Sequence, residues 1–201
     1  MNIFIIGHIL GAFIGAGAAY TSDITFMRSI RDGVIDQTEF RRLIRLSRFV
    51  WVGLALLIFS GVGLFLAKPD FYLHSVKFMS KMSIVLLLTI NGIIFHVYHL
   101  PFIKRRIGAT LFIGVQGKQG SWIILSGVLS VVSWTAALVL GTLDSVPFSY
   151  PTMIAFYSGV LGIGALFATV TIRKLLEKTD VSFIRKCAVG LGFVTLGLIA
   201  L

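Results

Sequence analysis

The sequence predicts an all-α integral membrane protein, a helical bundle of about six transmembrane helices. Of its 201 residues, 57% are hydrophobic and only 13% are charged, whereas roughly a quarter of the residues of a soluble domain are charged. The apolar residues fall in blocks close to the roughly 20 residues that a helix needs to cross a bilayer. We therefore expect a multi-pass protein of the plasma or inner cell membrane, with the lipid bilayer as its main partner.

Six apolar blocks are expected to form the spans, and they cover residues 3–20, 49–66, 78–101, 121–140, 152–171 and 187–201. Because the chain is short, little is left for a soluble domain. We expect a single membrane domain over residues 1–201, in which residues 1–141 form a four-helix core and residues 142–201 add a helical hairpin.

Two short motifs predict where helices begin. Asp36 and Glu39 have the spacing of a capping box, in which each side chain accepts a hydrogen bond from the backbone of the other residue. Asp70 follows a Lys-Pro pair that ends the second block. It is the expected N-cap of a helix that begins at Phe71 and continues into the third block.

The distribution of Lys and Arg predicts the orientation of the chain. Fifteen of the 18 Lys and Arg lie in the segments after the first, third and fifth blocks, and three, Lys68, Lys77 and Lys81, lie elsewhere. Since cytoplasmic loops are enriched in basic residues, these segments are expected inside and both termini outside. The same distribution accounts for the formal charge of +10 without a nucleic-acid partner, because no basic stripe alternates with aromatic residues.

The first block carries a histidine beside a row of glycines. Gly7, Gly11 and Gly15 recur every fourth residue, which leaves a surface that another helix or a flat ligand can approach closely. His8 lies beside Gly11 on the helix surface. An ionisable side chain within a span is a functional candidate, and the alternatives are plain helix packing for the glycines and a hydrogen bond to a neighbouring helix for His8.

The third block offers partners for His8. Lys81 lies about one turn inside its outer end, at nearly the depth of His8 for a rise of about 1.5 Å per residue. His74 lies on the same stripe of this helix, nearer the surface. The alternative for Lys81 is an outer-leaflet lysine whose charge reaches the headgroups.

Two further histidines, His96 and His99, are expected at the inner end of the third block. Their i, i+3 spacing places them on one face of an α-helix, which is compatible with a metal or haem site and equally with two interfacial side chains. No other metal site is expected, since Cys187 is the only cysteine and a CxxC pair is therefore excluded. Asp23, just past the first block, is expected to pair with Arg45 or Arg48.

Several of these residues together resemble a family of small membrane haem proteins. His8, Gly11 and Gly15 in the first block, the Ser60-Gly61 pair in the second and Lys81 in the third are similar to positions in proteins related to HemJ-type protoporphyrinogen oxidase and the copper-resistance D family. The resemblance covers residues 3–141. It implies a four-helix bundle that holds b-type haem, with the first-span histidine and the third-span lysine as the residues that matter.

The hypothesis from these residues is a b-type haem-binding redox or electron-transfer protein, and an oxidoreductase activity is left open. A haem needs an axial donor, a flat slot beside small residues and a second ligand at matched depth. His8 is the expected axial ligand, Gly11 and Gly15 the slot, and Lys81 the second ligand, with His74 in reserve. The sequence names no redox partner, and a homo-oligomer is compatible with it.

The alternative is a protein without a cofactor, either a transporter of small molecules or metal ions or a membrane scaffold. Such a transporter needs a polar cavity. Asn91, His8 and a stripe of serines on the fourth block are the side chains expected to line it; the stripe consists of Ser126, Ser130 and Ser133.

Overall fold

The computed structural model describes residues 3–32, 34–108 and 118–177, and its elements are helices. Five of the described helices are long and apolar enough to cross a membrane; they span Ile3–Ser29, Gln37–Ala67, Val76–Lys104, Trp122–Thr142 and Tyr150–Thr171. This confirms the predicted all-α membrane bundle. The sixth expected span, residues 187–201, lies outside the described residues.

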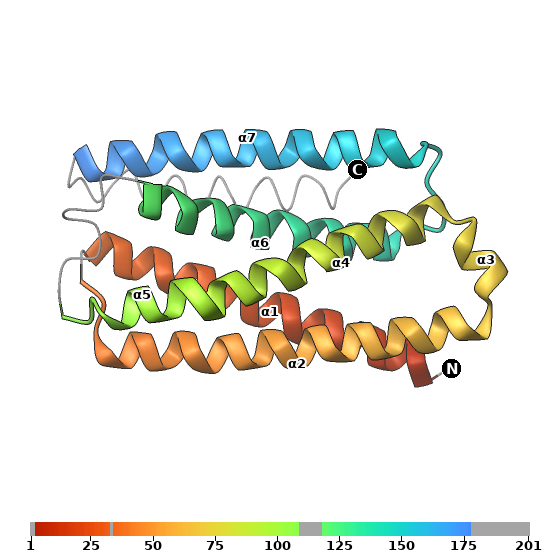
Figure 1. Cartoon of the computed structure of the whole chain (residues 1–201), viewed down its shortest axis with the longest axis horizontal. Helices are drawn as coiled ribbons and strands as arrows, with labels where there is room; N and C mark the ends of the chain where they lie inside the picture. Colours follow the sequence, from red (N-terminus) through yellow and green to blue (C-terminus); the bar gives the residue numbers. More distant parts are fainter. Residues whose placement is uncertain (1–2, 33, 109–117, 178–201) are drawn as a thin grey trace.

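The long helices lie side by side and form a bundle (Figure 1). In chain order they are α1 (Ile3–Asp32), α2 (Gln37–Ala67), α4 (Val76–Ile94), α6 (Lys118–Thr142) and α7 (Tyr150–Glu177). Helix α4 crosses the bundle obliquely, beside α6 and α7 at one end and toward α2 at the other (Figure 1). The end that holds the α1–α2 turn is called the inner end, following the charge distribution.

The helix starts agree with the sequence at one motif and differ at another. The capping box at α2 is confirmed: Asp36 Oδ1 accepts from Glu39 N at 2.6 Å, and Glu39 Oε2 accepts from Asp36 N at 3.1 Å. The expected cap at Asp70 was wrong. Pro69 starts a separate five-residue helix, α3 (Pro69–Leu73), because its missing N–H and fixed φ suit a first helical turn. Ser75 instead caps α4, accepting from Phe78 N at 3.3 Å.

The third span contains an irregular turn near its inner end. Helix α4 continues into a π-helix, η1 (Phe95–His99), and then into α5 (Leu100–Lys104). The N–H of Leu100 donates to the carbonyl of Phe95, five residues back. Pro101 follows at once, and it has no N–H to donate to the carbonyl of Val97. The wider turn therefore lies where the regular hydrogen-bond ladder is already interrupted.

Glycines bring α1 and α2 into backbone contact. A Cβ added at Gly53 would lie 2.3 Å from the backbone N of Gly15, and one added at Gly11 would lie 2.8 Å from the backbone N of Leu57. The other side of Gly15 holds the indole of Trp134 from α6, which is 1% exposed. The small residues predicted in the first span therefore allow α1 to cross α2 at close range and leave space for the ring of Trp134.

Two apolar clusters divide the interior. The central cluster joins all five spans through buried side chains: Ala16, Ala19, Leu54, Leu57, Ile84, Leu88, Trp134, Leu140 and Tyr157. The inner cluster gathers where the α1–α2 turn meets α5, and it consists of Ile35, Phe40, Leu43, Leu100 and Ile103. The cavity described below lies between these two clusters.

Gly53→Ala is expected to destabilise the bundle by about 1–3 kcal/mol, the usual range for overpacking an interior. The new methyl group would meet backbone atoms of α1, which cannot move aside as the tip of a side chain does. Gly17→Ala is the matched control, because nothing lies within 4 Å of a Cβ at Gly17. Thermal unfolding in detergent measures both variants, and equal midpoints would contradict the backbone contact.

Candidate functional site

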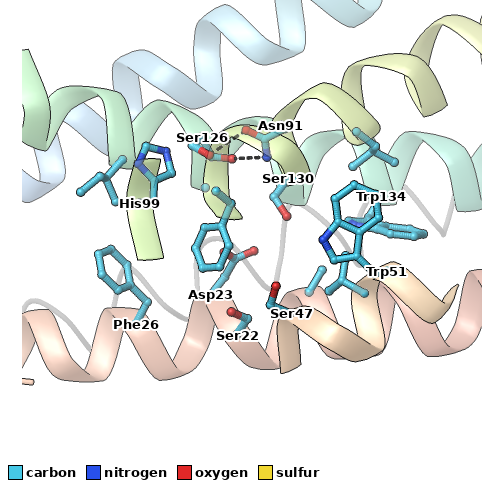
Figure 2. A pocket seen from close by; sticks show the side chains of 17 residues that line it. Ser22, Asp23, Phe26, Ser47, Trp51, Asn91, His99, Ser126, Ser130 and Trp134 are labelled. Carbon is cyan, nitrogen blue, oxygen red and sulfur yellow. Dashed lines mark hydrogen bonds between the residues drawn. The ribbon is translucent and has the colours of Figure 1, made fainter. Parts of the chain in front are cut away.

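A cavity with polar side chains in its wall lies between the central and inner clusters (Figure 2). It offers about 80 Å³ of space for the centres of water molecules, and about 10–15 Å³ suffices for one water. Its lining shares Ala19, Leu88 and Trp134 with the central cluster, while Phe26 and Phe95 separate it from the inner cluster. This space, called the inner cavity, therefore has several polar groups in a mainly apolar wall, is large enough for a small solute, and lies between the two apolar clusters.

Helix α1 contributes a carboxylate to the inner cavity. Asp23 Oδ1 faces Gly127 of α6, where an added Cβ would lie 3.9 Å away, and the Ser130 hydroxyl lies beside the carboxylate. Asp23 Oδ2 is buried and has no hydrogen-bond partner. The carboxylate thus has an unused acceptor inside the membrane-spanning part of the chain, where an unpaired charge is costly.

The expected ion pair of Asp23 with Arg45 or Arg48 was wrong. Both arginines are exposed, while Ser47 between them is buried and lines the inner cavity. Helical periodicity explains the difference, because the face of α2 that turns Ser47 inward turns its neighbours in the chain outward. Asp23 meets α6 instead of the basic start of α2.

His99 enters the inner cavity from the π-helix. Its side chain is 6% exposed, its Nε2 has no hydrogen-bond partner, and its ring packs edge-on against Phe95 at a centroid distance of 6.0 Å. His96 is exposed, and its Nδ1 lies 3.2 Å from Ser47 Oγ. The two histidines therefore do not share a face, since the π-turn rotates His99 away from the position that a regular α-helix gives it.

Asn91 and Ser126 form the wall between α4 and α6. Asn91 Nδ2 donates to the carbonyl of Ser126 at 3.0 Å, and Ser126 Oγ donates to Asn91 Oδ1 at 2.7 Å (Figure 2). Of the predicted serine stripe, Ser126 and Ser130 line the inner cavity. Ser133 lies one turn further out and bonds the Tyr157 hydroxyl at 2.7 Å. Asn91 and two of the three serines thus lie where the transporter hypothesis needs them, whereas His8 does not line this cavity.

His8 lies in the outer half of the bundle, against α2. Its Nδ1 is 3.0 Å from Ser60 Oγ, which itself donates to the carbonyl of Leu56 at 2.5 Å. Since the Ser60 hydroxyl donates to Leu56, the tautomer of His8 with its proton on Nδ1 fits this contact best, and that tautomer leaves the lone pair on Nε2. The hydrogen bond to a neighbouring helix, one of the alternatives for His8, is therefore present.

The other residues of the haem hypothesis lie apart from one another. Lys81 is half-buried and close enough to His8 for its charge to act on the imidazole. His74 is exposed, and its Nδ1 donates to the carbonyl of Asp70 at 2.9 Å. Gly11 and Gly15 face α2 and Trp134. The charge of Lys81 therefore reaches His8, but α2 and Trp134 occupy the surface of Gly11 and Gly15.

Comparison with known proteins adds nothing to this geometry, because no family model, curated protein or solved structure matches the chain. The resemblance to membrane haem proteins stays a prediction. In the described residues no group of three or more His, Cys, Asp and Glu side chains is placed to hold a metal ion. The polar groups of the inner cavity are therefore the main guide to function.

Sequence reasoning missed the meeting of Asp23 and His99 in one cavity. The signal that bears on it is Pro101, because a proline two residues after His99 indicates an irregular turn and hence a changed face. Nothing in the sequence pattern of α1 alone indicates that Asp23 meets α6.

Asn91→Ala is expected to lower the free energy of unfolding by about 1–2 kcal/mol, since it removes two interhelical hydrogen bonds worth about 0.6 kcal/mol each on average.

Asp23→Asn is expected to leave the stability unchanged or raise it, because Oδ2 has no bond to lose and an amide is less costly to bury than a carboxylate. Unfolding in detergent measures both variants. A larger loss for Asp23→Asn than for Asn91→Ala would mean that the carboxylate has a structural partner.

Proposed function

We propose that this protein is a carrier of small polar solutes in the cell membrane, and that the inner cavity is its solute site. One observation supports this most directly. Asp23 Oδ2 and His99 Nε2, from two different helices, are buried without hydrogen-bond partners and both line the same cavity. Ionisable side chains inside a membrane domain commonly mark the path of a substrate or an ion.

A bound solute would provide the hydrogen bonds that these atoms lack. A buried polar group without a partner costs free energy of about 1–3 kcal/mol, and the cost is greater for a charged group. A solute that donates to the carboxylate and contacts the imidazole offsets this cost and gains affinity from it. Because Asp23 Oδ2 and His99 Nε2 have no partner within the fold, both atoms are available to a ligand.

The position of the inner cavity also suits a carrier. The central cluster lies on its outer side and the inner cluster on its inner side, so the cavity lies at an intermediate depth in the bundle, as the solute sites of carriers do. A carrier opens such a site to one side at a time, often through irregular helical segments. The π-helix η1 and Pro101 form such a segment at the inner wall.

The test uses vesicles containing the purified protein and three planar solutes of similar size: urea, the guanidinium ion and the nitrate ion. Equal potassium on both sides with valinomycin present holds the membrane potential near zero, so the entry rates of the charged and neutral solutes can be compared directly. We expect at least one solute to enter faster with the wild-type protein than with Gly127→Leu. That side chain starts from a position in contact only with Asp23 Oδ1 and grows into the inner cavity. A roughly tenfold slower flux corresponds to roughly 1.4 kcal/mol in the barrier.

Gly17→Ala is the control for a glycine substitution away from the cavity, and it should transport like the wild-type protein, since its Cβ meets nothing within 4 Å. If none of the three solutes enters faster than into protein-free vesicles, the carrier proposal fails. Equal flux through wild-type and Gly127→Leu protein would place the path elsewhere.

A membrane redox protein with b-type haem is the second candidate, because the hydrogen bond from His8 to Ser60 leaves Nε2 as the lone-pair atom. A metal-bound histidine typically has its other ring nitrogen hydrogen-bonded in this way. The axial donor thus fits a haem iron, and Lys81 is near. The flat slot does not fit, since α2 and Trp134 cover Gly11 and Gly15.

The haem candidate has a spectroscopic test. Protein expressed with ample haem should show a Soret band that His8→Ala abolishes, because the substitution removes the axial nitrogen. His96→Ala should leave the band unchanged, as His96 is exposed at the inner end. A wild-type protein without a Soret band would exclude this candidate and leave the carrier proposal untouched.

A further inference from the structure

We infer that the inner cavity selects a small cation that donates hydrogen bonds, such as a solute with a guanidinium or primary ammonium group. This rests on the proposed carrier function and adds the class of solute. Three properties of the cavity wall support it: the charge, the hydrogen-bonding groups and the aromatic rings.

The charge of the wall is negative or zero. Asp23 is the one carboxylate among the lining residues, and no Lys or Arg lines the cavity in the described part of the chain. The nearest arginines along α2, Arg45 and Arg48, are exposed. His99 is the other titratable lining residue, so an anion would find no permanent positive charge while facing a buried carboxylate.

The hydrogen-bonding groups of the wall include one unpaired carboxylate oxygen. The Ser126 hydroxyl donates its hydrogen bond to Asn91 Oδ1, and one N–H of Asn91 donates to the carbonyl of Ser126. The Ser130 hydroxyl lies beside the carboxylate of Asp23. Oδ2 of Asp23 remains as a free acceptor. A ligand with N–H groups is complementary to this oxygen, and charge-assisted hydrogen bonds to a carboxylate are the stronger kind.

Aromatic rings complete the wall. Trp51 and Trp134 lie at one end of the cavity and Phe26 at the other, with Asp23 between them (Figure 2). The face of an aromatic ring attracts a cation, and the indole of Trp does so most strongly. A carboxylate between aromatic rings therefore favours a cation over a neutral solute of the same shape.

Guanidinium and urea test this directly, because they are planar, similar in size and differ by one positive charge. We expect guanidinium to enter vesicles with the wild-type protein about tenfold faster than urea does, after subtraction of the rates for protein-free vesicles, a ratio that corresponds to a modest electrostatic preference. Asp23→Asn should slow guanidinium to about the rate of urea and leave urea unchanged. Nitrate should enter slowest.

Three outcomes separate this inference from the carrier proposal. If urea or nitrate enters faster than guanidinium, the carrier stands and the cation inference is overturned. A guanidinium preference that persists in Asp23→Asn also overturns it. If no solute crosses the membrane, the carrier proposal fails. The binding measurement described next is then the only test of the cation inference.

Binding is measured from the tryptophan fluorescence of the wild-type protein. This measurement does not need the Asp23→Asn variant, so it tests the inference even if that variant does not fold. Trp51 and Trp134 line the cavity, whereas Trp122 is 65% exposed. We expect a saturable fluorescence change with guanidinium at concentrations far below those that denature proteins, and none with equal urea. A saturable change with urea alone, or no change with either solute, overturns the inference.

Discussion

The backbone contact of α1 with α2 at Gly15 and Gly53 fixes the positions of the other helices. Without side chains between them, the two helices lie close enough for Trp134 of α6 to rest directly on Gly15. One turn along α1, the Tyr20 hydroxyl meets Thr135 at 2.9 Å and holds α6 at the same level. The ring of Trp134 then closes the inner cavity from the outer side, so a change at this crossing also changes the size of the cavity.

Polar contacts in this bundle fall into two kinds. At the α1–α6, α4–α6 and α6–α7 interfaces, side chains pair with one another, as Ser133 does with Tyr157. Interhelical hydrogen bonds of this kind stabilise membrane bundles, where lipid tails compete little for apolar contacts. Asp23 Oδ2 and His99 Nε2 are buried without such partners. Of the buried side-chain atoms without partners in the described residues, these two line the inner cavity, where one ligand can pair with both, and the third, Ser80 Oγ, lies outside it.

Local signals in the sequence predicted local structure well. Hydropathy indicated the five described spans, and the spacing of Asp36 and Glu39 indicated the start of α2, because both depend on residues close in the chain. The face of His99 was not predictable from the regular helical period, since a π-turn shifts it. The contact of Asp23 with α6 was also not predictable from the sequence. It depends on how α6 packs against α1, and that packing is set by the glycines of α1 and by Trp134. The transporter hypothesis placed Asn91 and two serines correctly because these residues share a depth in their spans.

The two candidate functions use different halves of one bundle, and the central cluster separates them. His8 and Lys81 lie on its outer side, where the His8 imidazole is oriented by Ser60. Asp23 and His99 lie on its inner side. Trp134 belongs to both the central cluster and the cavity wall, so it lies between the two halves. A bundle of this form can position two sites independently, because each depends on its own pairs of helices: α1 with α2 for His8, and α1 with α6 and η1 for the inner cavity.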